Sequence, residues 1–293
     1  MIRIDFDYLE RHFPRRPCDA HQGTIGTLVS LTGSFGFAGA AVLSAKAALR
    51  SGVGLHYQVL PESIYPLFGG TVHESVCVPV KGNDIGTLCK ADIPAISAIL
   101  EKATAILIGC GMGNNDAAAE VLKAVLSTAK CPVIIDADGI NALARHIHSL
   151  EDVQSDIILT PHVKEFSRLS GLSVEAILSD PAKHAEEYSV KHRDVILVLK
   201  GHRTYIAQNG EVVENIAGNS GMAKGGSGDV LAGIIASLTA QGVKPYHAAV
   251  MGVHIHALAG DIAAAKLSQT AMLPSDLIDS LPEVYMKIED TLM

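Results

Sequence analysis

The sequence predicts an α/β fold in which a mostly parallel sheet lies between two layers of helices. Short runs rich in valine, isoleucine and leucine alternate with helical patterns between residues 27 and 199, which is typical of β-α-β units with buried strands. Hydrophobic residues make up 48% of the 293 residues, and aromatic residues only 4%. We find no linker, low-complexity segment or fixed-period repeat, so we expect one domain over residues 1–293.

The elements of the parallel part follow from short apolar runs and from helical spacing of apolar residues. The expected strands are 27–32, 55–60, 75–80, 105–108, 133–136, 157–159 and 195–199. The expected helices are 40–50, 93–102, 117–129 and, in several pieces, 165–192.

The pattern changes after residue 199. Two β-rich runs, 204–207 and 212–216, flank Asn209-Gly210, a dipeptide that favours the tight turn of a hairpin. We therefore expect an antiparallel hairpin at the edge of the parallel sheet. Helical patterns follow to the C-terminus.

Ligands of open α/β sheets bind beyond the carboxyl ends of the strands. Four loops rich in glycine or polar residues are expected at that edge: 33–39, 109–115, 160–165 and 218–229. We expect the ligand site to lie where these four loops meet.

The loop 218–229 is the most informative of the four. Its glycines permit close approach of a ligand to the backbone, and it delivers Asp229 to the start of an apolar helix. Free N–H groups at a helix N-terminus attract an anion such as phosphate. The P-loop motif does not fit, because Lys224 is followed by glycine. A simple helix cap is the structural alternative, and Lys224 is either a phosphate ligand or a solvated charge.

The loop 109–115 resembles a dinucleotide-binding fingerprint, with Asp136 at the end of the next strand as the ribose ligand. The third glycine of that motif is replaced by Asn114, which argues against a dehydrogenase. We favour a glycine loop that lines the ligand edge, and a tight turn alone is the other alternative.

Two further groups are candidate ligand contacts. Lys200 and Arg203 either meet the phosphates or ribose of a nucleotide or lie in a solvated turn. His162 either hydrogen-bonds a polar substrate or is a surface residue beside a helix whose N-cap is Thr160, with Pro161 at the first position.

Composition excludes several classes of partner. A formal net charge of −8 argues against nucleic acid, although a nucleotide needs only a local cradle. No run reaches the ~18 apolar residues that a membrane span needs. Five cysteines without a C-x-x-C motif indicate reduced thiols, and the charged N-terminus is unlike a signal peptide, so we expect a cytoplasmic protein.

Metal chemistry is expected only through a nucleotide. His254 and His256 are two residues apart on a helical pattern and therefore point in different directions; His146 and His148 have the same spacing. Neither pair predicts a zinc site. Mg²⁺ is expected instead to arrive with a nucleotide, because it uses few protein ligands.

Taken together, these motifs resemble the ADP/ATP-dependent NAD(P)H-hydrate dehydratase family over nearly the whole chain. The segments that carry the resemblance are 33–41, 109–113, 136–143, 159–162, 200–201 and 219–233. The resemblance implies a ribokinase-like fold, a three-layer α/β/α sandwich. Two departures concern local loop shape: Val163-Lys164 stands where the family often has Pro-Gly, and Lys224 where it often has threonine or serine.

The resemblance also implies roles for particular residues. The hydrated nicotinamide nucleotide is expected to contact Ala40, Gly111, His162 and Asp229. The adenine nucleotide is expected to contact Lys200, Gly201, His202, Arg203, Thr204 and Gly228, and our interpretation of the glycine loop adds Gly226 and Ser227. No protein metal ligands are assigned.

The expected activity is repair of hydrated NADH or NADPH, with ADP or ATP as co-substrate and Mg²⁺ as its companion. Asp229 would act as the base for phosphorylation of the ring hydroxyl, and the phosphate would then leave. The bacterial-type members of the family favour ADP. Two alternatives remain, a small-molecule hydroxyl kinase of the same fold and a non-catalytic nucleotide sensor. A homo-oligomer, such as a tetramer, is also expected.

Overall fold

The computed structural model describes the chain except for residues 1, 5, 146–149, 151, 152, 154 and 293. Its strands are β1 (Ile2–Arg3), β2 (Thr27–Leu31), β3 (Leu55–Pro61), β4 (Val76–Val80), β5 (Ala105–Ile108), β6 (Val133–Ile135), β7 (Ile157–Leu159), β8 (Val195–Leu199), β9 (Thr204–Gln208) and β10 (Glu211–Asn215). Its helices are α1 (Phe6–His12), α2 (Ala38–Arg50), α3 (Tyr65–Gly69), α4 (Ile93–Leu100), α5 (Asp116–Thr128), α6 (Asp138–Arg145), α7 (Val163–Ser170), α8 (Val174–Ser179), α9 (Pro181–Lys191), α10 (Ser227–Ala240), α11 (Pro245–Ala271) and α12 (Pro274–Leu292).

The strands form one sheet in the order β1-β10-β9-β8-β7-β6-β5-β2-β3-β4. The pairs from β8 to β4 are parallel, whereas β9 pairs antiparallel with both β8 and β10. The predicted hairpin is confirmed, and its turn residues Asn209 and Gly210 both have positive φ, at 51° and 86°. The two-residue strand β1 pairs parallel with β10 and covers the hairpin's outer edge.

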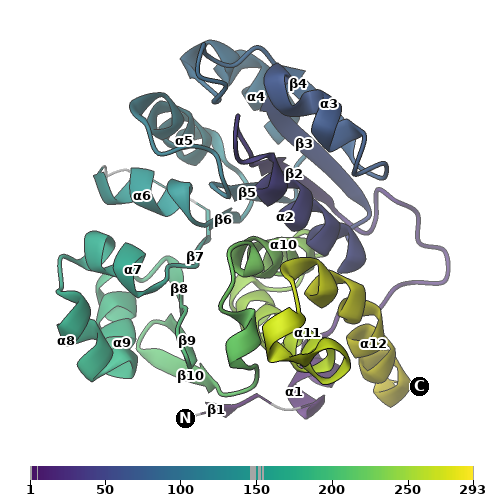
Figure 1. Cartoon of the computed structure of the whole chain (residues 1–293), viewed down its shortest axis with the longest axis vertical. Coiled ribbons are helices and arrows are strands. Elements are labelled where there is room, and N and C mark those ends of the chain that lie inside the picture. The colour runs from purple at the N-terminus through teal and green to yellow at the C-terminus, as the bar shows by residue number, and fades with distance from the viewer. Residues whose placement is uncertain (1, 5, 146–149, 151–152, 154, 293) are drawn as a thin grey trace.

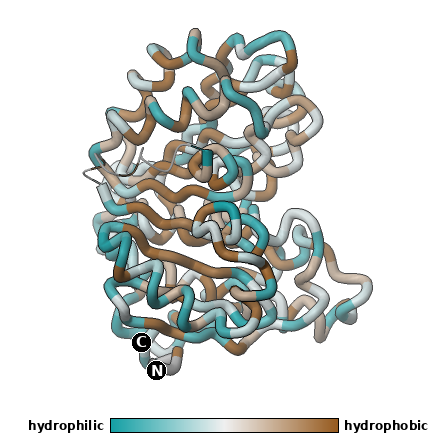
Figure 2. The backbone as a smooth tube through the Cα atoms, turned by 90° about the vertical axis from the view of Figure 1, so that its left-hand side faces the viewer, coloured by the Kyte–Doolittle hydropathy of each residue, from teal (hydrophilic) through white to brown (hydrophobic). Residues whose placement is uncertain are grey.

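Helices cover both faces of this sheet, so the expected three-layer arrangement is confirmed (Figure 1). The alternation along β5 shows how: Leu107 packs with the core beneath α10 and α11, while Ile106 and Ile108 pack with the core beneath α4 to α9. Figure 2 shows the strands as predominantly hydrophobic tube inside the molecule, as expected for strands buried on both faces.

Helix α11 corrects one expectation from the sequence. Among the described residues it is the one helix long and apolar enough to cross a membrane, by length and composition alone. In the fold, 72% of its most apolar window is buried. It packs against α10, α12 and the sheet, so its hydrophobicity serves the protein core.

Four elements were not expected from the sequence: β1, α1, α3 and α6. The first three are short, and β1 depends on pairing with a strand about 200 residues away. Helix α6 begins with Asp138-Gly139, which resembles a loop. The position of Gly139 favours glycine, because the Cβ of any other residue would lie only 2.8 Å from Ile135 Cγ2.

Candidate active site

The predicted loops meet at the carboxyl edge of the sheet. The Gly33 N–H donates to the Cys110 carbonyl at 2.8 Å, and the Ser34 hydroxyl donates to the Gly111 carbonyl at 2.8 Å. These bonds join the loop after β2 to the loop after β5. The backbone of these two loops is therefore held in place at this edge of the sheet.

Ala40 and Gly111, both predicted substrate contacts, lie side by side in this part of the structure. Gly111 has a φ of 61°, and a Cβ added to it would lie 2.8 Å from the Ala40 Cβ and 2.9 Å from the Phe37 Cβ. Only glycine fits this position without moving the first turn of α2. The first turn of α2 thus packs directly against the loop after β5.

The glycine loop ends at the N-terminus of α10, as predicted. Gly226 is the N-cap, with a φ of 101°, and Asp229 lies in the first turn. The Ser227 N–H donates to the Lys224 carbonyl at 3.2 Å, so it is not part of an anion cradle. The N–H groups of Gly228 and Asp229 remain, since a helix leaves its first N–H groups unpaired within itself.

Lys224 has neither of the roles considered for it. Its ammonium donates to the carbonyls of Thr270 and Met272, at 2.7 and 2.5 Å. These are carbonyls at the end of α11, which a cation stabilises. Lys224 thus ties the glycine loop to α11 and does not reach toward a phosphate.

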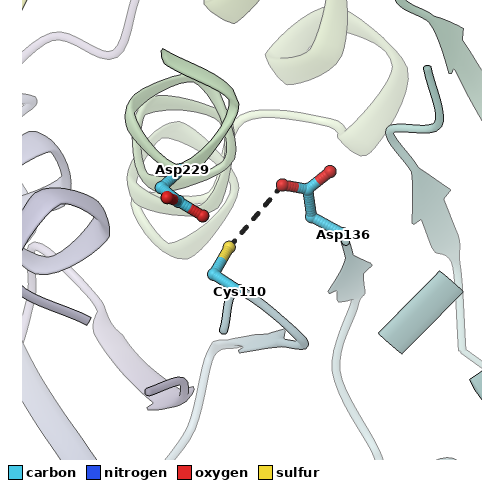
Figure 3. A group of neighbouring side chains, drawn as sticks. All are labelled: Cys110, Asp136 and Asp229. Carbon is cyan, nitrogen blue, oxygen red and sulfur yellow. Dashed lines mark hydrogen bonds between the residues drawn. The ribbon is translucent and has the colours of Figure 1, made fainter. Parts of the chain in front are cut away.

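A polar cluster lies beneath the start of α10. One potential ligand atom from each of Cys110, Asp136 and Asp229 lies within 4.8 Å of the other two (Figure 3). Asp136 accepts hydrogen bonds from the Thr160 hydroxyl and the Lys200 ammonium, both at 2.7 Å, and its Oδ2 is 3.7 Å from the Cys110 sulfur. At 1% exposure Asp136 has no surface left for a ribose, so the dinucleotide-fingerprint interpretation is wrong.

The two carboxylates of this cluster differ in environment. Burial and, next, the charge of Asp136 raise the pKa of Asp229 to about 6. Burial acts to lower the pKa of Lys200, but Asp136 and Glu165 outweigh it and the pKa is raised. Lys200 is therefore a fixed cation, and Asp229 is a base that titrates near neutrality.

The cluster does not form a cage for a resident metal. Mg²⁺ prefers oxygen ligands in octahedral geometry, whereas one group here is a buried thiol whose pKa burial raises well above its ordinary value. The Asp136 carboxylate already forms an ion pair with the Lys200 ammonium. Only Asp229 keeps a carboxylate for a cation, so any Mg²⁺ would have to be held mainly by nucleotide phosphates.

His162 is the N-cap of α7, which corrects the expectation that Thr160 caps the helix. Its Nδ1 accepts from the Glu165 N–H at 3.1 Å, and Glu165 Oε2 accepts from the His162 N–H at 2.8 Å, a reciprocal capping box. Half of the His162 side chain is exposed, with Nε2 3.4 Å from Glu165 Oε1. His162 is thus both a cap and a side chain open to a ligand.

Of the predicted nucleotide-binding stretch 200–204, only Lys200 belongs to the buried cluster. Residues 201–203 are exposed and Thr204 is half-buried at the start of β9. Arg203 pairs with Glu214 of β10 at 2.8 Å. Lys200 lies against the glycine loop, because a Cβ on Gly228 would be 3.2 Å from its Nζ. The structure brings Lys200 and Gly228 together and places Arg203 farther along the hairpin.

His254 and His256 of α11 are buried, at 9% exposure each. His254 hydrogen-bonds Asn215 at 3.0 Å, and burial lowers the pKa of His256, which lies near Ser227, to about 4. Neither belongs to the potential metal-ligand group found among the described residues. His146 and His148 lie outside the described residues.

Sequence reasoning missed Glu165 as a site residue. Burial raises its pKa to about 7, and it contacts both His162 and, electrostatically, Lys200. It also did not foresee that Cys110 and Thr160 contact Asp136. Their positions in the sequence could have indicated this contact. Cys110, Asp136 and Thr160 each follow a parallel strand within one or two residues, and the ends of these strands meet at one edge.

Comparison with known proteins decides the family. A family model described as NAD(P)H-hydrate dehydratase matches residues 28–283. This chain belongs to the NAD(P)H-hydrate dehydratase family.

Individual relatives agree with this assignment. The chain is 36% identical over 278 residues to the bifunctional NAD(P)H-hydrate repair enzyme of Moorella thermoacetica, covering 94% of this chain and 52% of that protein. The chain thus spans about half the length of such bifunctional relatives. It is 33% identical to the ADP-dependent (S)-NAD(P)H-hydrate dehydratase of Bacillus subtilis, covering 97% of both chains.

A solved structure supports the fold. The ADP/ATP-dependent NAD(P)H-hydrate dehydratase of Bacillus subtilis, co-crystallised with ATP/Mg²⁺, superimposes with a TM-score of 0.82 and 30% identity, covering 97% of each chain. The ribokinase-like arrangement expected from the resemblance is confirmed.

Proposed function

We propose that this chain is an ADP-dependent dehydratase that restores NADH and NADPH from their hydrated forms. One observation carries the proposal. Asp229 stands at the first turn of α10, beside two unpaired N–H groups, with a pKa raised to about 6. Such a carboxylate can accept a proton from a hydroxyl while the helix N-terminus stabilises a phosphate.

In the first step, Asp229 accepts the proton of the hydroxyl group on the hydrated nicotinamide ring. The hydroxyl oxygen attacks the terminal phosphorus of ADP, and the bond from that phosphorus to the bridging oxygen breaks, releasing AMP. The N–H groups of Gly228 and Asp229 stabilise the charge on the transferred group. Hydroxide, a poor leaving group, is thereby converted to a phosphate ester.

In the second step, the lone pair of the ring nitrogen expels the phosphate and breaks the carbon–oxygen bond. Loss of a proton from the neighbouring ring carbon then forms the double bond of the dihydronicotinamide. The net reaction consumes hydrated NADH and ADP and yields NADH, AMP, phosphate and a proton. Phosphorylation is thus a means of expelling a hydroxyl group.

We assign substrate contacts to Ala40, Gly111 and His162, which lie with Asp229 at the carboxyl edge of the sheet. The adenine nucleotide is assigned to the stretch 200–204 and to the start of α10, with Mg²⁺ arriving on its phosphates. Lys200 contributes through its charge, because its ammonium is bonded to Asp136. These assignments rest on the proximity of the loops.

The test is to incubate the protein with hydrated NADH, Mg²⁺ and ADP and to follow the return of the reduced-nicotinamide absorbance. We expect recovery with ADP, and loss of at least about 10²-fold in rate for Asp229→Asn with an unchanged fold. Asp116→Asn is the control, since it removes an exposed carboxylate on α5. Near-normal turnover by Asp229→Asn would remove Asp229 from the base role.

The same assay separates the alternatives. A stable phosphorylated product without NADH recovery would indicate a hydroxyl kinase of the same fold. Tight nucleotide binding without turnover would indicate a sensor. Running ADP and ATP in parallel determines the preferred co-substrate, and hydrated NADPH determines the preferred hydrate.

Three further features belong to the proposal. We infer that residues 1–293 form one dehydratase domain, that the protein works in the cytoplasm, and that it is a homo-oligomer, for which a tetramer is our specific hypothesis. The cytoplasmic location is supported by the five cysteines, all of which are free thiols.

A further inference from the structure

A cavity lies far from the carboxyl edge of the sheet. It has a volume of about 620 Å³, is partly open to solvent, and is lined by residues 13–16, the end of α2, Gln241 after α10, and α12. Small-molecule sites commonly have volumes of ~300–1,000 Å³. Helices α2 and α10 carry Ala40 and Asp229 in their first turns, so this cavity lies at their opposite ends.

The cavity is lined with positive charge in a chain whose net charge is −8. Its lining includes three arginines, Arg15, Arg16 and Arg50, and one carboxylate, that of Glu289. Arg16 donates to the Gly52 carbonyl, but within the described residues Arg15 and Arg50 make no ion pair or side-chain hydrogen bond. Two guanidinium groups are thus available to an anion, which each can bind through paired N–H donors.

The wall of the cavity is apolar and aromatic. Phe13 and Tyr285 lie with ring centroids 5.9 Å apart, and Leu49 and Pro282 complete this side. The buried hydroxyls of Ser51 and Tyr285 also lie in the lining, where they interact with each other.

We propose that this cavity is a second binding site, for a small organic anion that carries a phosphate or carboxylate on a flat apolar body. Arg15 and Arg50 bind the anionic group, and the side formed by Phe13 and Tyr285 packs against the flat body. The site is separate from the dehydratase site and does not depend on the function proposed for it.

A structural role for the arginines is the rival explanation. The carboxyl ends of α2 and α10 adjoin the cavity, and positive side chains there offset the partial negative charge of a helix C-terminus. Arg16 already acts in this way through Gly52. If Arg15 and Arg50 only do the same, their loss lowers stability without affecting ligand binding.

The experiment is a calorimetric titration with phenyl phosphate in the presence of saturating ADP, which keeps the probe out of the nucleotide site. We compare the wild type with the double variant Arg15→Ala/Arg50→Ala. The control is Lys123→Ala/Arg193→Ala, which removes two exposed cations elsewhere. We expect binding by the wild type and the control, and a Kd at least tenfold higher for the Arg15/Arg50 variant.

Companion probes identify the chemistry. Benzoate replaces the phosphate by a carboxylate, inorganic phosphate removes the flat body, and phenol removes the charge. We expect binding by one or both aromatic anions and weaker binding of inorganic phosphate and phenol. The proposal is overturned if neither aromatic anion binds, or if the Arg15/Arg50 variant, checked for folding by circular dichroism, binds as the wild type does.

Discussion

At the scale of single residues, the two carboxylates of the site differ in their properties because they have different partners. Asp136 is held by the Thr160 hydroxyl and the Lys200 ammonium, whereas Asp229 lacks such a cation contact and titrates at about 6. Ala137, next to Asp136, has a φ of 49°, which is strained for a residue other than glycine. The fold therefore accepts local strain next to Asp136, which lies beneath Asp229.

The first prediction concerns the pH dependence of the reaction. If Asp229 is the base, kcat/KM rises with pH through about 6, because only the deprotonated carboxylate accepts a proton. Asp136→Asn removes a charge that raises the pKa of Asp229 and frees Lys200, which lowers it, so the rise moves to lower pH. Asp116→Asn, an exposed carboxylate on α5, leaves the profile in place. Coincident wild-type and Asp136→Asn profiles would contradict this coupling.

The second prediction concerns Glu165 and stability. Burial raises its pKa from 4.5 to about 7, with opposing effects from Lys200 and Arg168 and a reinforcing one from Asp136. Because the folded-state pKa is raised, the stability contribution of Glu165 is complete below pH 4.5 and is lost as the pH rises through 7.

Glu165→Gln keeps the cap to His162 and cannot ionise. The wild type should therefore lose up to about 3 kcal/mol of unfolding free energy relative to this variant between pH 4.5 and pH 8. Urea unfolding of both proteins across this range measures the difference. A difference that does not change with pH would mean that the carboxyl group is not perturbed by burial.

At the scale of elements, the sequence predicts well wherever local chemistry decides the structure. The buried strands and the Asn209-Gly210 hairpin follow from apolar runs and turn residues. Some errors occur where distant partners decide. Strand β1 exists because β10 lies beside it. Lys224 similarly finds its carbonyls on α11, about 46 residues away. The cap of α7 is a local error of another kind, because His162 and Glu165, three residues apart, form a reciprocal capping box.

The third prediction tests the contact between α2 and α10. A Cβ on Gly233 of α10 would lie 2.3 Å from the Ser44 carbonyl oxygen and 3.0 Å from the Ala47 Cβ. Gly233→Ala must push the two helices apart and should lower the unfolding free energy by about 1–3 kcal/mol or more. Gly39→Ala, at a helical position of α2 with no atom within 4 Å, should leave stability unchanged or raise it by up to about 1 kcal/mol. Equal denaturation midpoints for both variants would contradict the close contact.

At the scale of the whole molecule, topology accounts for the part of the site that the sequence could predict. Parallel strands bring their carboxyl ends to one edge, so loops separated by up to about 200 residues were expected to meet there. Which side chains pair beneath them was not predictable, because Cys110, Asp136 and Lys200 come from three different strand ends.

The surface beside this edge supports the proposed homo-oligomer. Phe35 is 70% exposed and Ile85 64% exposed, and Leu67 of α3 is 55% exposed. Phe35 lies against Gly86 and Ser63, which places it next to Ile85 and close to α3. Exposed apolar residues gathered in this way are typical of protein contacts, whereas single ones are ordinary.

The fourth prediction is that this apolar surface joins copies of the chain. Light scattering after gel filtration should give the wild type a mass that is a multiple of 30.8 kDa. Ile85→Glu places a charge in the contact and should lower that mass, because an unpaired carboxylate is costly to bury. Ile216→Glu is the matched control, since Ile216 is 65% exposed but follows β10 on another part of the molecule, and it should leave the mass unchanged. A monomeric wild type would refute the oligomer, and an oligomer insensitive to Ile85→Glu would place its interface elsewhere.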